Sequence, residues 1–144
     1  MIIIGGTIIG DNAFKGCASL ISIIIPNAVT TIEYSAFEGC SSLTSIVIPN
    51  SVKSIGRYAF YKCSSLASLK IGNNLTSIGD EVFWDCSSLT SVVIPNSVTT
   101  IGRGIFGNCN SLTIYCEAAS KPSGWNSDWN PSNRPVHWGV NTFI

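Results

Sequence analysis

Residues 43–65 read LTSIVIPNSVKSIGRYAFYKCSS, and the pattern of this stretch recurs along most of the chain with a fixed step of 23 residues. No insertion or deletion interrupts the step between Ile2 and Leu112. A unit this short cannot bury its apolar side chains alone, so it must stack on copies of itself. The step therefore predicts a solenoid in which each repeated position forms a ladder. The clearest positions are those of Phe14, Phe37, Phe60, Phe83 and Phe106; Cys17, Cys40, Cys63, Cys86 and Cys109; and Leu20, Leu43, Leu66, Leu89 and Leu112.

The first part of the unit has the pattern of a strand with one buried face. Ile46 and Ile48 alternate with Ser45 and Val47, which is the period of two expected of such a strand. Pro49 lacks the N–H group that a ladder needs and ends the strand. Stacked copies are expected to form a parallel sheet with strands about 4.8 Å apart.

The rest of the unit contains a turn, a short extended stretch and a second turn. The extended stretch ends at Ile55, and Gly56 provides a tight corner. In the next segment, Cys63 follows Ala59 by four positions and Phe60 by three. This spacing predicts a single helical or 3₁₀ turn with one apolar face.

The full unit, L-x-S-I-x-I-P-N-x-V-x-x-I-G-x-x-A-F-x-x-C-x-S, resembles the leucine-rich repeat of the BspA-like type over residues 2 to 115. Residues 114–139 (IYCEAASKPSGWNSDWNPSNRPVHWG) resemble the C-terminal cap of such arrays. The resemblance implies a leucine-rich-repeat solenoid with a parallel sheet on its concave side and short strands and helical or 3₁₀ turns opposite. It also implies a binding or adhesion role, in a bacterial cell-surface or secreted protein, without catalysis.

We expect one domain with two parts. Residues 1–113 form the repeat array, made of a partial first repeat and four to five full rungs, and residues 114–144 form an irregular cap. The array begins within a repeat, so the apolar edge Ile2–Ile4 needs a cover. Either the chain is a fragment of a longer array, or another subunit covers this edge in a homo-oligomer.

Composition excludes several classes of partner. The chain has 144 residues, 11% of them charged, and a net charge of zero, whereas soluble chains usually carry about 25% charged residues. Nucleic-acid binding and attraction to an anionic membrane both need a basic surface, so neither is expected. The apolar runs are far shorter than the roughly 18 residues of a membrane span, and no signal peptide is recognisable in this chain.

The cysteine column predicts buried, reduced thiols that act as small apolar side chains. A straight ladder with His137 as the single histidine does not supply the converging ligands of a zinc site. The same lack of histidine argues against a catalytic triad. We therefore expect no enzyme activity, metal or cofactor. Cys116 lies outside the ladder, and its role stays open.

Two outward columns of the strand are the first candidate binding surface. The second of them is an apolar stripe interrupted by one lysine, and contiguous exposed apolar surface often marks a protein-binding site. The alternative is that β-branched residues simply favour a sheet. The columns are Ser22, Ser45, Ser68 and Ser91, and Ile24, Val47, Lys70 and Val93.

Aromatic residues provide two further candidates. Tyr58, Tyr61 and Trp84 either form an aromatic patch for binding on two adjacent repeats or are isolated exposed aromatics, which are also normal. In the tail, Trp125, Trp129 and Trp138 either cover the last rung or stack on sugars.

The favoured function is a non-catalytic protein-binding or adhesion module whose partner is an extracellular or host protein. The alternatives are a carbohydrate-binding module that uses the tail tryptophans, and a structural spacer within a longer array.

Overall fold

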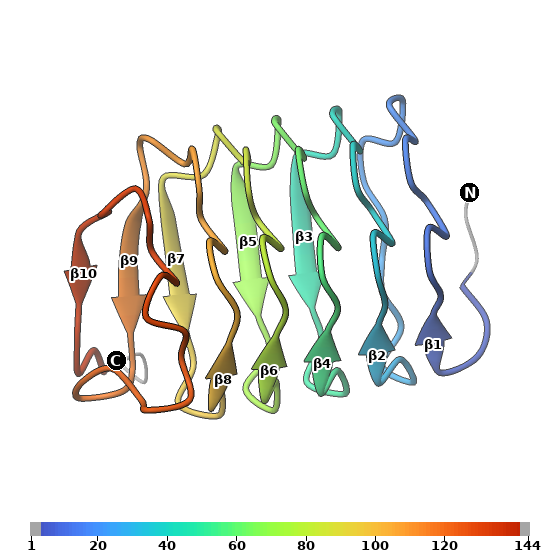
Figure 1. Ribbon diagram of the computed structural model, residues 1–144. Helices are drawn as coiled ribbons and strands as arrows, with labels where there is room; N and C mark the ends of the chain where they lie inside the picture. Colours follow the sequence, from blue (N-terminus) through green and yellow to red (C-terminus); the bar gives the residue numbers. More distant parts are fainter. Residues whose placement is uncertain (1–3, 142–144) are drawn as a thin grey trace.

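In the computed structural model, which describes residues 4–141, the chain winds into a coil of stacked rungs (Figure 1). One strand of each rung contributes to a five-stranded parallel sheet. Its strands pair with a step of 23 residues, so that Ile9, Ile32 and Ile55 are in register. The strands, in order, are β1 (Ile8–Ile9), β2 (Thr31–Ile32), β4 (Ser54–Ile55), β6 (Ser77–Ile78) and β8 (Thr100–Ile101).

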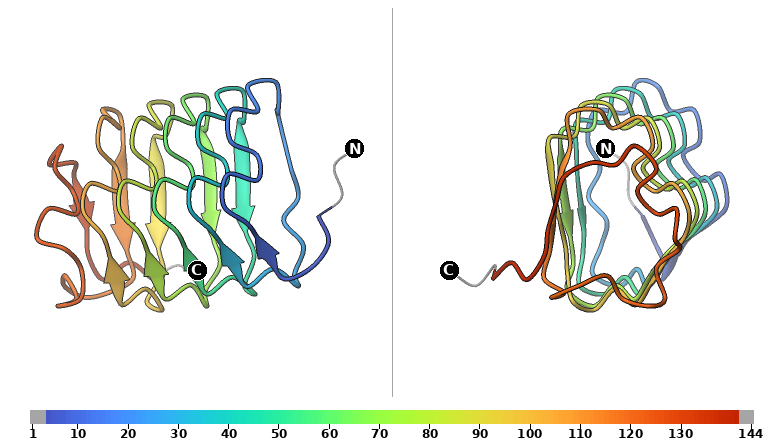
Figure 2. Two further views of the ribbon diagram at one scale, coloured as in Figure 1. Left: turned by 45° about the vertical axis from the view of Figure 1, so that its right-hand side comes forward. Right: turned by 60° about the vertical axis from the view of Figure 1, so that its left-hand side comes forward.

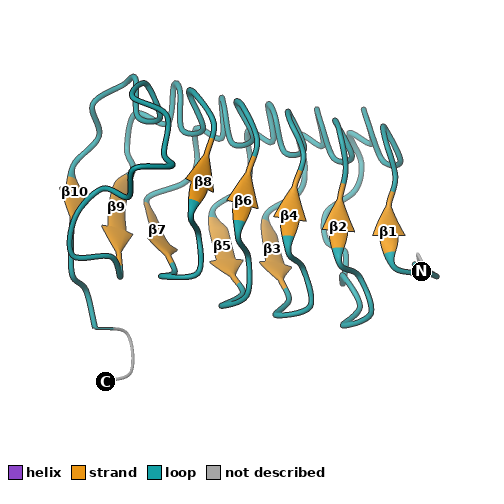
Figure 3. Cartoon of the chain, turned by 60° about the horizontal axis from the view of Figure 1, so that its bottom comes forward, coloured by secondary structure: helices purple, strands orange, loops and turns teal. Residues whose placement is uncertain are grey.

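A second row of strands lies on another side of the coil (Figure 3). Here β3 (Ser45–Ile48) pairs with β5 (Ser68–Ile71), and a separate sheet contains β7 (Ser91–Ile94), β9 (Thr113–Cys116) and β10 (Val136–His137). All pairs are parallel, which confirms the parallel sheet expected from the alternation of Ile46 and Ile48. The matching stretch of the first full repeat, residues 22–25, is not a strand.

The predicted helical or 3₁₀ turn is wrong, because residues 4–141 contain no helix. The N–H groups of Ala59, Tyr61 and Cys63 each donate to the carbonyl three residues earlier, as in consecutive β-turns. The N–H groups between them donate instead to the next rung, as Phe60 does to the Val82 carbonyl at 3.0 Å. A helix would use every N–H group within itself, whereas this segment shares half of them with its neighbour.

The alternation of N–H groups that bond within the rung and N–H groups that bond to the next rung requires left-handed backbone at two positions of each rung. One is the Tyr58 position, with φ of 62° there and 53° at Glu81. The other is the Lys62 position, where Gly16 and Gly39 occur in the first two rungs. Non-glycine residues pay a cost of roughly 1 kcal/mol for this conformation, and the bonds to the neighbouring rung offset it.

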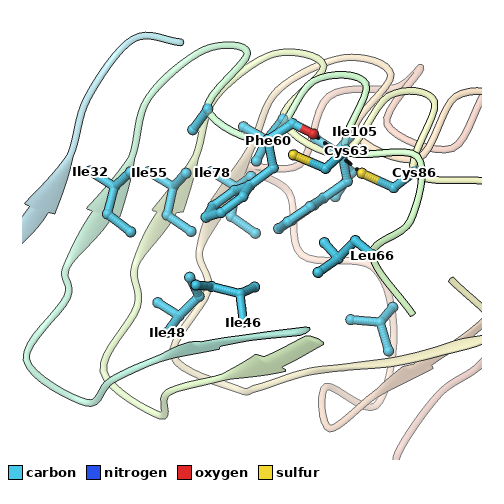
Figure 4. Close-up of a cluster of buried hydrophobic side chains, with 14 of the residues drawn as sticks. Ile32, Ile46, Ile48, Ile55, Phe60, Cys63, Leu66, Ile78, Cys86 and Ile105 are labelled. Carbon is cyan, nitrogen blue, oxygen red and sulfur yellow. Dashed lines mark hydrogen bonds between the residues drawn. The ribbon is translucent and has the colours of Figure 1, made fainter. Parts of the chain in front are cut away.

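From the second rung onward, the Phe, Cys and Leu columns of the sequence become buried ladders in the core (Figure 4). The rings of Phe37, Phe60 and Phe83 are fully buried and nearly parallel, with centroids 5.1 and 5.6 Å apart. The thiols lie beside them, and the Cys63 Sγ donates a hydrogen bond to the Phe37 carbonyl of the preceding rung at 3.2 Å. The cysteines are free, as expected.

The tail continues the coil by one irregular turn. Trp125 forms a parallel bridge with Ile101, and its indole N–H donates to the Val98 carbonyl at 3.1 Å. Further along, the Ile105 N–H donates to the Trp129 carbonyl. The tail, which forms the last turn of the coil in Figure 2, thus pairs with backbone groups that the last regular rung would otherwise expose.

The N-terminal edge is only partly described. Ile2 and Ile3 lie outside the described residues, and Ile4 is half-buried against the core. In β1, the first strand, the side chain of Ile8 is 52% exposed. No helix within residues 4–141 has the length and apolarity needed to cross a membrane.

Candidate binding surface

The outward columns of the second strand row are exposed along the coil. Exposure is 86% for Ile24, 56% for Val47 and 38% for Val93, and Lys70 and the four serines of the neighbouring column are also exposed. Val47 is in register with Lys70, and Val93 with Tyr115. The predicted positions therefore share one surface, which we call the outer face: Ser22, Ile24, Ser45, Val47, Ser68, Lys70, Ser91 and Val93, together with Tyr115.

The outer face extends beyond the residues that the sequence predicted. His137 pairs with Tyr115 across β9 and β10, and the two rings stack at 5.1 Å with an interplanar angle of 14°. The sequence missed this extension because Tyr115 follows Val93 by 22 residues and not by 23. The strand-like alternation of Thr113, Ile114 and Tyr115 was the sequence signal that could have placed Tyr115 on this face.

A groove of about 550 Å³ opens on the outer face between β5 and β7. The lining from β5 includes Lys70 and half-buried Leu69, whereas the equivalent Ile46 of β3 is fully buried. Val93 and Tyr115 contribute apolar and aromatic area from the other side. The groove thus combines an apolar lining with one cationic side chain.

The predicted aromatic patch on the turns forms only in part. The rings of Tyr58 and Tyr61 are 5.2 Å apart, and the Arg57 guanidinium lies 4.6 Å from the centre of the Tyr58 ring. Tyr34, which the sequence analysis left out of the patch, joins it at 5.9 Å from Tyr58. Within residues 4–141, no ring contact joins Trp84 to these tyrosines.

Trp84 instead lies over the next rung, where glycines make room for it. A Cβ atom at Gly107 would overlap the indole ring, and one at Gly104 would lie 3.1 Å from it. The glycine at position 107, in the column of Tyr61 and Trp84, therefore accommodates the ring of the preceding rung.

The tail tryptophans form a packed cluster. Trp125 and Trp129 are 3% and 6% exposed, and their rings meet edge to face at 4.9 Å. Trp138 is half-buried against both. Sugar stacking needs a free aromatic face, which Trp125 and Trp129 do not offer, so the geometry favours their role as a cover for the last rung.

The ladder thiols are poor nucleophiles. Burial raises the pKa of Cys63 to about 12, and the neighbouring Cys40 adds to this shift. Burial alone raises the pKa of Cys116, on β9, to about 12. Nucleophilic chemistry requires the thiolate, which these sites disfavour.

Acidic side chains hold neighbouring rungs together. Asp80 Oδ1 accepts a hydrogen bond from the Arg103 backbone N–H at 2.9 Å, and Glu81 forms an ion pair with the Arg103 guanidinium at 3.5 Å. Among residues 4–141, no three His, Cys, Asp or Glu side chains gather as metal ligands would.

Comparison with known proteins adds the family and several structural relatives. A family model of the BspA type leucine rich repeat region matches residues 7–121 in six copies. A leucine-rich repeat protein of T. pallidum shares 40% identity with a TM-score of 0.74, over 76% of this chain and 51% of that one. A leucine-rich repeat protein from Bacteroides ovatus shares 31% identity with a TM-score of 0.78, over 92% of this chain and 35% of that one.

A third similar structure is a leucine rich cell surface protein from Faecalibacterium prausnitzii, with 29% identity and a TM-score of 0.67 over 85% of this chain and 33% of that one. The chain thus spans about half of the first relative's length and about a third of the other two. No curated protein sequence matches it. The fold is a parallel β-solenoid of about six turns, and the match over most of its length shows that this chain belongs to the BspA-type leucine-rich repeat family.

Proposed function

We propose that this chain is a non-catalytic protein-binding module that binds its partner through the outer face. The observation that carries the proposal is the row of exposed Ile24, Val47 and Val93, which half-buried Tyr115 extends in register with Val93. Exposed apolar side chains on a surface otherwise covered by serine suit contact with a protein. The chain has no net charge, so apolar and hydrogen-bonded contacts fit better than electrostatic attraction.

The parent protein is proposed to be secreted or carried on a bacterial cell surface, with an adhesion role. Support comes from the relative in F. prausnitzii, which is described as a leucine rich cell surface protein. The matching family model describes a repeat region and not a catalytic domain, which supports the absence of enzyme activity.

A matched pair of variants tests the proposal. Val47 and Ile8 are both exposed apolar strand residues, at 56% and 52%, but only Val47 lies on the outer face. The wild-type chain, Val47→Asp and Ile8→Asp are compared by surface plasmon resonance against a panel of purified extracellular matrix and plasma proteins. We expect at least one partner whose Kd rises about tenfold or more with Val47→Asp and stays unchanged with Ile8→Asp.

Two results would contradict the proposal. One is a partner that binds Val47→Asp as tightly as the wild-type chain, which would place the contact elsewhere. The other is a complete absence of binding across the panel, which would favour a spacer role within a longer array.

A further inference from the structure

The turns that follow the second strand row bear a column of asparagines on four successive rungs. The column is Asn27, Asn50, Asn73 and Asn96, and all four side chains are exposed. A side-chain amide has a carbonyl acceptor and two N–H donors. Whether these groups are available to a ligand depends on whether the neighbouring rung already uses them.

One member of the column uses its amide to join two rungs, and the next does not. Asn50 Oδ1 accepts a hydrogen bond from the Asn73 N–H at 3.0 Å. The same bond one rung later would join the Asn96 N–H to Asn73 Oδ1, but the Asn96 N–H donates instead to the Glu117 carboxylate at 2.9 Å. Among residues 4–141, neither the Asn73 nor the Asn96 side-chain amide makes a hydrogen bond.

The turns of Asn73 and Asn96 are held to opposite neighbours. The strands before them, β5 and β7, lie on consecutive rungs in Figure 1 but are not paired. Gly72 replaces the proline of the other rungs, and a Cβ atom there would lie 2.7 Å from the Pro49 carbonyl group, so the turn after β5 lies close to the β3 rung. The turn after β7 is bonded to Glu117 in the β9 rung.

A depression of about 490 Å³ lies where these two turns meet, and Asn73 and Asn96 both line it. The depression shares Asn73, Glu117 and Val140 with the groove of about 550 Å³ between β5 and β7, so the two are continuous. Each volume falls in the range of ligand sites, which is roughly 300–1,000 Å³. We call the depression and the groove together the amide groove.

The amide groove has a polar part and an apolar part. The amides of Asn73 and Asn96 belong to the polar part, at the turns. Val93, which is 38% exposed, and half-buried Leu69 belong to the apolar part, over the strands. The lining includes one cation, Lys70, and one anion, Glu117, so it has no net charge.

A neutral saccharide has the chemistry that matches this lining. Each sugar hydroxyl is both a donor and an acceptor, so neighbouring hydroxyls can pair with the donors and the acceptor of one amide. The C–H surface of the sugar ring is apolar and can pack on Val93. An extended peptide cannot insert between β5 and β7, because their Cα atoms approach within 8 Å of each other. A strongly acidic ligand would bring its charge close to Glu117.

We propose that the amide groove binds a short neutral saccharide chain, whose hydroxyls bond to the side-chain amides of Asn73 and Asn96 while its C–H surface packs on Val93. The proposal goes beyond the proposed function, because it assigns a saccharide and not a protein to this part of the chain. The two can therefore fail separately.

A glycan array probed with the full, fluorescently labelled chain tests the proposal. The array presents malto-, cello- and manno-oligosaccharides, with oligogalacturonates as acidic counterparts. We expect one or more of the neutral saccharides to bind, with little dependence on salt concentration. A preference for oligogalacturonates would contradict the proposal.

Isothermal titration with the best neutral saccharide then compares the wild-type chain, Asn96→Ala, Asn73→Ala and the matched control Asn27→Ala. Asn27 is exposed in the same column and its amide also makes no hydrogen bond among residues 4–141, but it lies outside the amide groove. We expect Kd to rise about tenfold with Asn96→Ala and with Asn73→Ala, and to stay unchanged with Asn27→Ala. Urea unfolding checks that all the variants are as stable as the wild-type chain.

Two further results would overturn the proposal. One is an array on which no saccharide binds the wild-type chain more tightly than Asn96→Ala, and the other is an equal loss of affinity for Asn96→Ala and Asn27→Ala. If a protein partner still loses affinity with Val47→Asp while no saccharide binds, the proposed function stands and only the saccharide site is wrong.

Discussion

Removal of one ring from the phenylalanine ladder tests the account of the core. Phe60 is fully buried and stacks on Phe37 and Phe83 at centroid distances of 5.1 and 5.6 Å. In Phe60→Ala, the lost transfer free energy of the ring is about 2 kcal/mol. The cavity and the loss of two ring contacts add roughly 1–3 kcal/mol. We therefore expect the free energy of unfolding to fall by about 3–5 kcal/mol.

Phe14→Ala is the matched control, because Phe14 belongs to the same column but is half-buried and, among residues 4–141, stacks on Phe37 alone, at 5.2 Å. We expect this variant to lose about 1–2 kcal/mol. Urea unfolding followed by tryptophan fluorescence measures both values, with the m value as a check that the transition stays comparable. A loss below about 1 kcal/mol for Phe60→Ala, or equal losses for both variants, would refute the continuous ladder.

Three further predictions concern the thiols, the glycine beneath Trp84 and the tail. Burial raises the pKa of the Cys63 thiol from 9.0 to about 12. The contribution of this thiol to the free energy of unfolding is therefore complete below about pH 9 and is lost as the pH rises toward 12. A free energy of unfolding that increases over this range would contradict the burial of the thiol. Gly107→Ala should lower the unfolding free energy by about 1–3 kcal/mol, because its Cβ overlaps the Trp84 ring, and denaturant unfolding that shows no loss would rule out this contact. Trp125→Ala should cost about 3–5 kcal/mol and Trp138→Ala clearly less, so equal melting temperatures for these two variants would speak against the packing of the tail.

The sequence predicts the core and the strands well because both depend on columns that repeat. Phe60 and Ile46 are buried where their columns require it. The turn segment is different, because the spacing of Ala59 and Cys63 fits either a helix or a pair of β-turns. What decides between them is whether alternate N–H groups donate to the next rung, and a pattern of apolar residues carries no information on that.

The candidate site was likewise predictable from the sequence only where its residues belong to repeated columns. Val47 and Val93 are exposed as the alternation predicts, whereas His137 belongs to the outer face only through its pairing with Tyr115. The missing pairing between β5 and β7 was not predicted, because Gly72 in place of proline looks like an ordinary exchange between two turn residues. Its effect depends on the close approach to Pro49, which only the three-dimensional structure reveals.

Amide hydrogen exchange of the free chain tests most directly whether the ladder is open between β5 and β7. Leu69 and Ile46 occupy the same column, but the Ile46 N–H is directed toward its paired strand β5, whereas the Leu69 N–H is directed toward β7, with which β5 is not paired. We predict that the Leu69 amide exchanges at least about tenfold faster than that of Ile46. Equal protection of the two amides would show a closed ladder and contradict a strand order in which β5 and β7 are not paired.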